Sequence, residues 1–125
     1  MSKLPPLPHN YDESWGVEAT GETWDPELAD AIVGAVLLVG ITYMNADGTV
    51  DRHDQLYGTI ARADRRGGIL LNLAGLRQGQ SWNMPPETRA LSPASPGDYQ
   101  LRSTGEVVTD PDYTAVWTLR KPTTS

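Results

Sequence analysis

The sequence predicts a mainly β protein on three observations. Twelve glycines and ten prolines among 125 residues indicate many tight turns. Two segments near the C-terminus, "DYQLR" and "DYTAVWTLRK", alternate apolar and polar residues with the period of a strand. Apolar runs such as "ILLNL" are short and end at turn residues. The length is that of a single domain.

One short helix is expected over residues 24–33, within "TWDPELADAIVG". Thr23 or Asp25 can cap its first turn, because a short polar side chain accepts hydrogen bonds from backbone N–H groups there. Pro26 suits the first helical position, since it has no N–H to satisfy. Gly34 is expected to end the helix.

The apolar run "AIVGAVLLVGI", residues 31–41, is too short to cross a membrane. Eleven residues span about 16 Å as a helix, roughly half of a ~30 Å hydrocarbon core. From residue 35 onward the run is rich in β-branched side chains and leads into the turn "NADG". The sequence therefore predicts a strand over residues 35–44, buried on both faces.

The second predicted strand covers residues 49–63 and is long enough to bend, with Gly58 as the expected bend. After the turn "ADRRGG" follow "ILLNL" and "SWNM" as strands, then one helical turn in "PPETRALSP". The last strands lie within residues 97–121. Six side chains are expected to be largely buried in the core: Val39, Ile41, Leu56, Ile60, Leu71 and Trp117.

This order of elements resembles the SH3-like small β-barrels, including the Sm-like group, over residues 33 to about 102. "GTIARADRRGGILLNL" is similar to the Sm pattern of a glycine in a bent strand, an Asp-containing turn and an apolar strand. The resemblance implies a single small barrel over residues 24–121, with the short helix before it and a C-terminal strand extension. No segment matches the RNA-binding loop of Sm proteins.

A second resemblance concerns the amino-acid sequence of two segments and not the order of elements. "LVGITYMNADGTV" and "MPPETRALSPASPGDYQLRSTGEVVTDPDY" are similar to segments of a group of small bacterial proteins with no assigned activity. This resemblance implies a compact bacterial domain and carries no function.

The net charge of −6 is confined to one end of the chain. Residues 1–30 hold seven acidic side chains and one lysine, whereas residues 31–125 hold nine acids and nine bases. Residues 1–23 also lack periodicity, so they are expected to form an irregular acidic arm. A solvated leader without a binding role is the simpler alternative. The arm residues predicted to contact a partner are Tyr11, Asp12, Glu13, Trp15, Glu18 and Glu22.

The sequence shows no motif for catalysis or metal binding. Cysteine is absent, and His9 and His53 are the only histidines. In "DRHD" strand alternation places Asp51 and His53 on one face, with Arg52 and Asp54 on the other. Two ligands do not complete a metal site. We therefore expect no enzyme, no metal and no cofactor.

The leading hypothesis is a non-enzymatic protein-binding domain, specifically a bacterial immunity protein that neutralises a cognate basic toxin. The N-terminus has no apolar signal segment, so a cytoplasmic protein is expected, as a monomer or small homo-oligomer. The alternative is a small-barrel regulator that binds a ligand or nucleic acid, disfavoured by the acidic pI of about 4.7. A structural subunit that self-associates through a barrel edge is a third hypothesis. The residues of the alternative face are Tyr57, Arg62, Arg65, Arg66 and Trp82.

Overall fold

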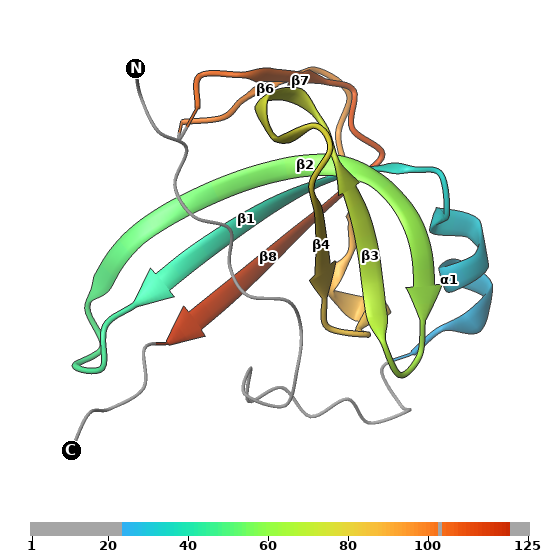
Figure 1. Cartoon of the computed structure of the whole chain (residues 1–125), viewed down its shortest axis with the longest axis horizontal. Helices are drawn as coiled ribbons and strands as arrows, with labels where there is room; N and C mark the ends of the chain where they lie inside the picture. Colours follow the sequence, from blue (N-terminus) through green and yellow to red (C-terminus); the bar gives the residue numbers. More distant parts are fainter. Residues whose placement is uncertain (1–23, 103, 121–125) are drawn as a thin grey trace.

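The computed structural model describes residues 24–102 and 104–120, which form a mainly β domain with one short helix (Figure 1). Two 3₁₀ turns, η3 (Gly75–Arg77) and η4 (Thr88–Ala90), lie on either side of the fourth strand. The predicted mainly β class is confirmed. The helix and strands are α1 (Pro26–Ile32), β1 (Val36–Met44), β2 (Val50–Asp64), β3 (Gly68–Leu73), β4 (Ser81–Met84), β5 (Ser92–Pro93), β6 (Asp98–Gln100), β7 (Val107–Thr109) and β8 (Tyr113–Arg120).

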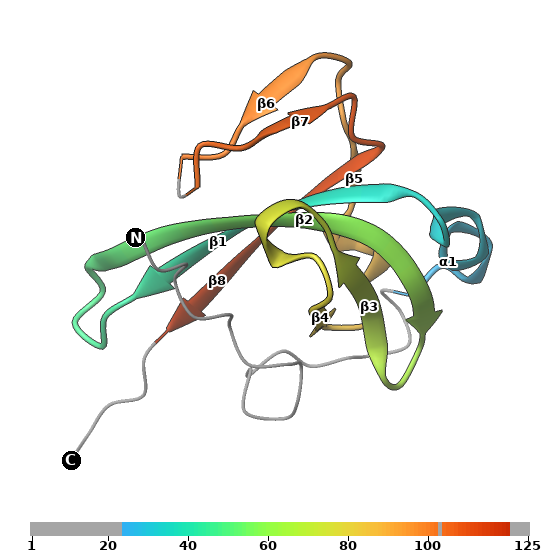
Figure 2. The ribbon, with the colours of Figure 1, turned by 45° about the horizontal axis from the view of Figure 1, so that its top comes forward.

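The strands form a six-stranded sheet and a separate two-stranded hairpin. The order in the large sheet is β4-β3-β2-β1-β8-β5. Neighbours from β1 to β4 pair antiparallel, whereas β8 pairs parallel to β1. The hairpin of β6 and β7 lies over the outer, convex side of the curved sheet (Figure 2). The long central strands therefore carry a core on one face and the hairpin on the other.

The predicted SH3-like or Sm-like barrel is not confirmed, because the sheet of the described residues is open. Closure would require β4 and β5, at the two ends of the strand order, to pair with each other. Pro85 and Pro86 follow β4, and Pro93 forms half of β5. Proline has no N–H to donate to a neighbouring strand, so β4 cannot be extended past Met84 and β5 lacks a donor at Pro93. The C-terminal strand also lies inside the sheet, between β1 and β5, and not as an extension.

The helix ends follow the predicted chemistry. Asp25 is the N-cap, and its carboxylate accepts hydrogen bonds from the N–H groups of Glu27 at 3.0 Å and Leu28 at 3.2 Å. Gly34 lies just after the helix with a φ of 91°, a conformation that favours glycine. In the described chain no helix has the length and apolar character needed to cross a membrane.

The main core lies under the inner, concave face of the large sheet. All six predicted core side chains are buried, and the indole of Trp82 fills the centre with 1% of its surface exposed. The curve of β2 brings β3 and β4 over this core (Figure 1). Gly58 lies where the strands are closest, because an added Cβ there would overlap the backbone of Asn72. A register shift follows between Ile60 and Arg62.

A smaller apolar cluster lies on the outer face, beneath the β6–β7 hairpin. Leu38 from β1 packs there against Leu101 and Val108 of the hairpin segment, with Tyr57 at the margin. Residues 37–39 of β1 are consequently buried on both faces. The prediction that the whole strand is buried on both faces is wrong for its second half, because the outward-facing Gly40 and Thr42 are only half-buried and line a pocket. Beyond Gly40 the hairpin no longer covers the sheet, and the outer face is open to a pocket.

Candidate functional site

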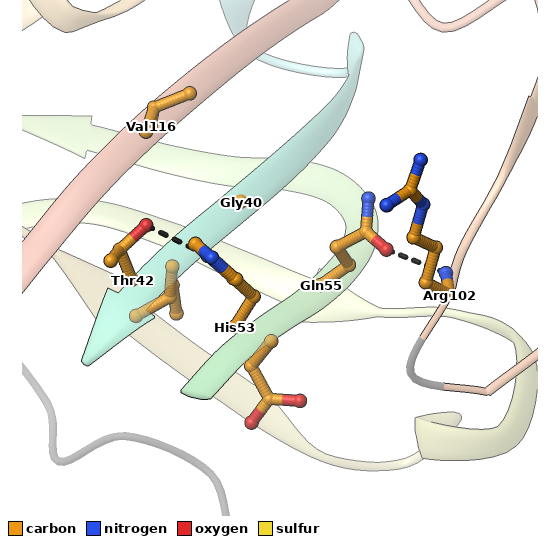
Figure 3. Close-up of a pocket in the computed structure, with 8 residues that line it drawn as sticks. Gly40, Thr42, His53, Gln55, Arg102 and Val116 are labelled. Atoms are coloured by element: carbon orange, nitrogen blue, oxygen red, sulfur yellow. Dashed lines mark hydrogen bonds between the residues drawn. The ribbon is translucent and has the colours of Figure 1, made fainter. Parts of the chain in front are cut away.

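The candidate site is a pocket of about 360 Å³ on the outer face of the large sheet, beside the hairpin. Strand alternation brings its side chains together from three neighbouring strands, and Arg102 approaches from the hairpin side (Figure 3). Ile41 and Asp54 also border it, but their side chains belong to the inner face. The outer-face residues that line the pocket are Gly40, Thr42, His53, Gln55, Arg102 and Val116.

Gly40 forms the floor of the pocket and has no structural reason to be glycine. Its φ lies outside the left-handed region, and an added Cβ would meet only a methyl carbon of Val116, at 4.0 Å. That distance is an ordinary van der Waals contact. Gly58 on the next strand differs, because a Cβ there would collide with the backbone of β3. A glycine inside a strand without packing or conformational need marks a place where something else approaches the backbone.

Two hydrogen bonds hold the polar walls of the pocket. The hydroxyl of Thr42 and Nδ1 of His53 lie 3.1 Å apart, across the β1–β2 pair. Oε1 of Gln55 accepts from the backbone N–H of Arg102 at 2.7 Å, which fixes the chain at the hairpin base (Figure 3). The Arg102 side chain is exposed and makes no ion pair with any described residue. The pocket therefore carries a positive charge that no side chain among the described residues neutralises.

The hairpin is anchored to the rest of the domain through Glu106. Its carboxylate accepts a hydrogen bond from the Tyr57 hydroxyl at 3.4 Å and one from the N–H of Leu76 at 3.0 Å. Burial of the ring, together with the negative charge of Glu106, raises the pKa of Tyr57. Tyr57 therefore stays a neutral donor at physiological pH. These contacts join the hairpin to β2 and η3, next to the pocket.

The inner face of the same strand pair holds a buried carboxylate, Asp54, with arginines near it. Asp54 is 3% exposed, and Nη1 of Arg52 lies 4.0 Å from its carboxylate. Burial raises the pKa of this carboxyl, while the nearby Arg52 and Arg77 oppose the rise. The Arg52 guanidinium also lies 4.4 Å above the ring of Tyr43.

The alternation predicted for "DRHD" is confirmed for Arg52, His53 and Asp54, whereas Asp51 falls at a register shift between β1 and β2. Asp54 and Arg52 meet on the inner face, whereas His53 contributes to the outer pocket. The inner cluster is a poor metal site, because a single carboxylate lies between two guanidinium groups. Within residues 24–102 and 104–120, no group of three or more His, Asp or Glu side chains could hold a metal ion.

The residues of the predicted alternative face are not brought together. Trp82 is 1% exposed in the core, so it presents no ring for a base to stack on. Tyr57 packs beneath the hairpin. Arg62, Arg65 and Arg66 are exposed at or just before the β2–β3 turn, five or more residues along the chain from Tyr57. An aromatic and basic surface is therefore not formed by this set.

The predicted partner-binding residues Tyr11, Asp12, Glu13, Trp15, Glu18 and Glu22 lie outside the described residues. Sequence reasoning did not single out the pocket. One signal could have pointed to it: Gly40 interrupts a run of β-branched and aliphatic residues inside a strand.

No protein-family model, no curated protein and no solved structure matches this chain.

Proposed function

We propose that this protein is a non-enzymatic protein-binding domain that docks a basic partner, and specifically an immunity protein that neutralises a cognate toxin. The observation that carries the proposal is the charge division of the chain. Residues 1–30 contain the whole net charge of −6, while residues 31–125 are balanced. A neutral β domain with an acidic end has one surface suited to a basic protein.

The run of acidic residues in positions 1–23 continues into α1. Glu27 and Asp30 lie exposed on α1, which lies at one end of the large sheet (Figure 1). Trp24 packs against the core just before this helix and connects it to the domain. A partner that binds residues 1–23 would therefore meet two further carboxylates on α1.

Charge of this kind acts first on the rate of association. A localised acidic surface attracts a basic partner over distances up to the Debye length, about 8 Å at physiological salt, and orients it before contact. Aromatic side chains such as Tyr11 and Trp15 would then act as anchors that slow dissociation. A toxin with a basic, substrate-binding surface is the class of partner that this mechanism inhibits, because the acidic arm competes for that surface.

A nucleic-acid-binding role has less support. The acidic segment repels phosphates, Trp82 is buried, and the three arginines at the β2–β3 turn have no exposed aromatic neighbour from the predicted set.

The test compares the full chain with a deletion of residues 1–22 in pull-downs from the native host, followed by stopped-flow kinetics on the captured protein. We expect the full chain alone to recover a basic protein and to inhibit its activity at equal molar ratio. Association should be at least about tenfold slower for the deletion at low salt and should converge at high salt. The deletion leaves every strand and α1 intact, so its melting curve verifies folding.

Point variants test the effect of charge on association without shortening the chain. Glu27→Gln with Asp30→Asn removes two charges from α1, and we expect it to slow association at low salt. Asp47→Asn with Asp51→Asn is the matched control, since both are exposed carboxylates at or just after the β1–β2 turn, and the opposite end of β2 is the one beside α1 (Figure 1). Recovery of the same proteins with the same yield and kinetics by the full and deleted chains would overturn the proposal.

A further inference from the structure

The outer-face pocket has a shape and a charge that the proposed function does not use. A volume of about 360 Å³ is within the range of small-molecule sites. The space exists because Gly40 has no side chain in the middle of β1, although an alanine would fit there without strain. Alanine or a β-branched residue would also be more favourable in a strand. An occupant that needs this space accounts for the glycine.

The chemistry of the walls selects the class of occupant. Arg102 supplies a planar guanidinium that forms no ion pair with a described residue, and the exposed ring of His53 adds a second nitrogen group. Among the described residues that line the pocket, none presents a carboxylate on the outer face, because that of Asp54 belongs to the inner face. A single arginine matches a carboxylate through two parallel hydrogen bonds. The apolar side of the pocket is Val116, which is 70% exposed.

We propose that this pocket binds a small organic carboxylate. Arg102 holds the carboxylate, His53 donates to it from the opposite wall, and the carbon chain lies over Gly40 against Val116. The Thr42 hydroxyl orients the His53 ring through the 3.1 Å contact with Nδ1, which leaves Nε2 to face the ligand. Phosphate fits the pocket less well, because phosphate sites generally combine several cations or backbone N–H groups.

The inference is independent of the acidic arm. The pocket is lined by residues 40–42, 53–55, 102 and 116, and none of them lies in the charged N-terminal segment. Failure of one proposal therefore leaves the other standing.

The test is a ¹H–¹⁵N NMR titration of the full chain with sodium butyrate. n-Butylammonium chloride is the control for the carbon chain, and inorganic phosphate is the control for the anion. We expect butyrate to cause saturable shifts of the Gly40, Thr42, His53 and Arg102 amides, with a dissociation constant of about 1 mM for a ligand of this size.

Three variants locate the binding. Arg102→Gln should weaken butyrate binding at least about tenfold, since it removes the charged hydrogen bonds. Gly40→Val should abolish it by filling the floor. Arg65→Gln is the matched control, because it removes one exposed arginine at the β2–β3 turn, and it should bind as the wild type does.

Several results would overturn the proposal. They are unsaturable shifts, equal shifts with butylammonium, tighter binding of phosphate at the same amides, or unchanged butyrate binding by Arg102→Gln. The backbone spectrum of each variant shows directly whether it is folded, so a misfolded Gly40→Val leaves the decision to Arg102→Gln.

Discussion

The two faces of the large sheet use the same three strands for different purposes. On the inner face β1, β2 and β8 contribute Val39, Leu56 and Ala115 to a close-packed core. At the adjacent position of each strand, the outer face presents Gly40, Gln55 and Val116 to the pocket. Position in the strand therefore decides whether a residue stabilises the fold or forms the pocket.

The difference between the two faces shows how a pocket can form on a strand whose other residues stabilise the fold. The inner face and the β6–β7 hairpin bury the first half of β1 on both sides. The outer side of its second half is then free to carry polar side chains and a glycine. Substitutions on the inner face should lower the free energy of unfolding, whereas those on the outer face beyond residue 40 should leave it nearly unchanged.

The largest expected effect is that of truncation on the inner face. Leu71 is fully buried, so Leu71→Ala should reduce the free energy of unfolding by about 2–5 kcal/mol through lost burial and a residual cavity. Its neighbour Asn72 is exposed on the opposite face of β3, and Asn72→Ala is the control, with a change within about 0.5 kcal/mol. Urea denaturation measures both. Equal losses would contradict the assignment of faces.

A smaller effect is expected from the buried charge of Asp54. Because burial raises its pKa above the usual aspartate value, the folded state binds this proton more tightly than the unfolded state. The contribution of Asp54 to stability is therefore full below the usual aspartate pKa. It is lost as pH rises towards the raised pKa of the folded state. Asp54→Asn should remove this loss, so that its stability relative to the wild type improves with pH across that window.

Asp47 provides a control of opposite sign for the same measurement. Hydrogen bonds from the Thr49 hydroxyl and N–H lower the pKa of Asp47 at the β1–β2 turn. Its contribution to stability is present above the usual aspartate pKa and is lost as pH falls. Asp47→Asn should therefore change the pH dependence in the other direction. Parallel urea titrations across the acidic range test both, and equal slopes for wild type and Asp54→Asn would contradict the account.

Local structure could be predicted from the sequence because local chemistry determines it. The helix begins at the Asp25 cap and ends before Gly34, and β4 ends at Pro85, each as the residue types require. The alternation of Tyr113 to Leu119 likewise predicted a strand with one buried face. Alternation is the same whether a strand pairs parallel or antiparallel, so it could not show that β8 lies parallel to β1.

The pocket was harder to predict because its residues are distant in sequence. Arg102 joins His53 and Gly40 in the lining of one pocket only through the fold of the hairpin over the sheet, where its N–H donates to Gln55, and no local pattern encodes that arrangement. Trp82 was predicted as a strand residue and also as a ring on which a base could stack. Its burial in the structure excludes the second role. Aromatic type alone does not distinguish a core side chain from a binding one.

The central claim is that Gly40 is needed to keep the pocket open, whereas Gly58 is needed for the packing of β2 against the backbone of β3. The free energy of unfolding of Gly40→Ala and Gly58→Ala, measured in urea, tests it most directly. Gly58→Ala should lose about 1–3 kcal/mol or more, because its Cβ would overlap the backbone of Asn72. Gly40→Ala should be as stable as the wild type or more stable by about 0.5–1 kcal/mol, because the methyl group fits and alanine has less chain entropy to lose. A loss of stability in Gly40→Ala comparable to that in Gly58→Ala would contradict the claim, since both glycines would then be structural.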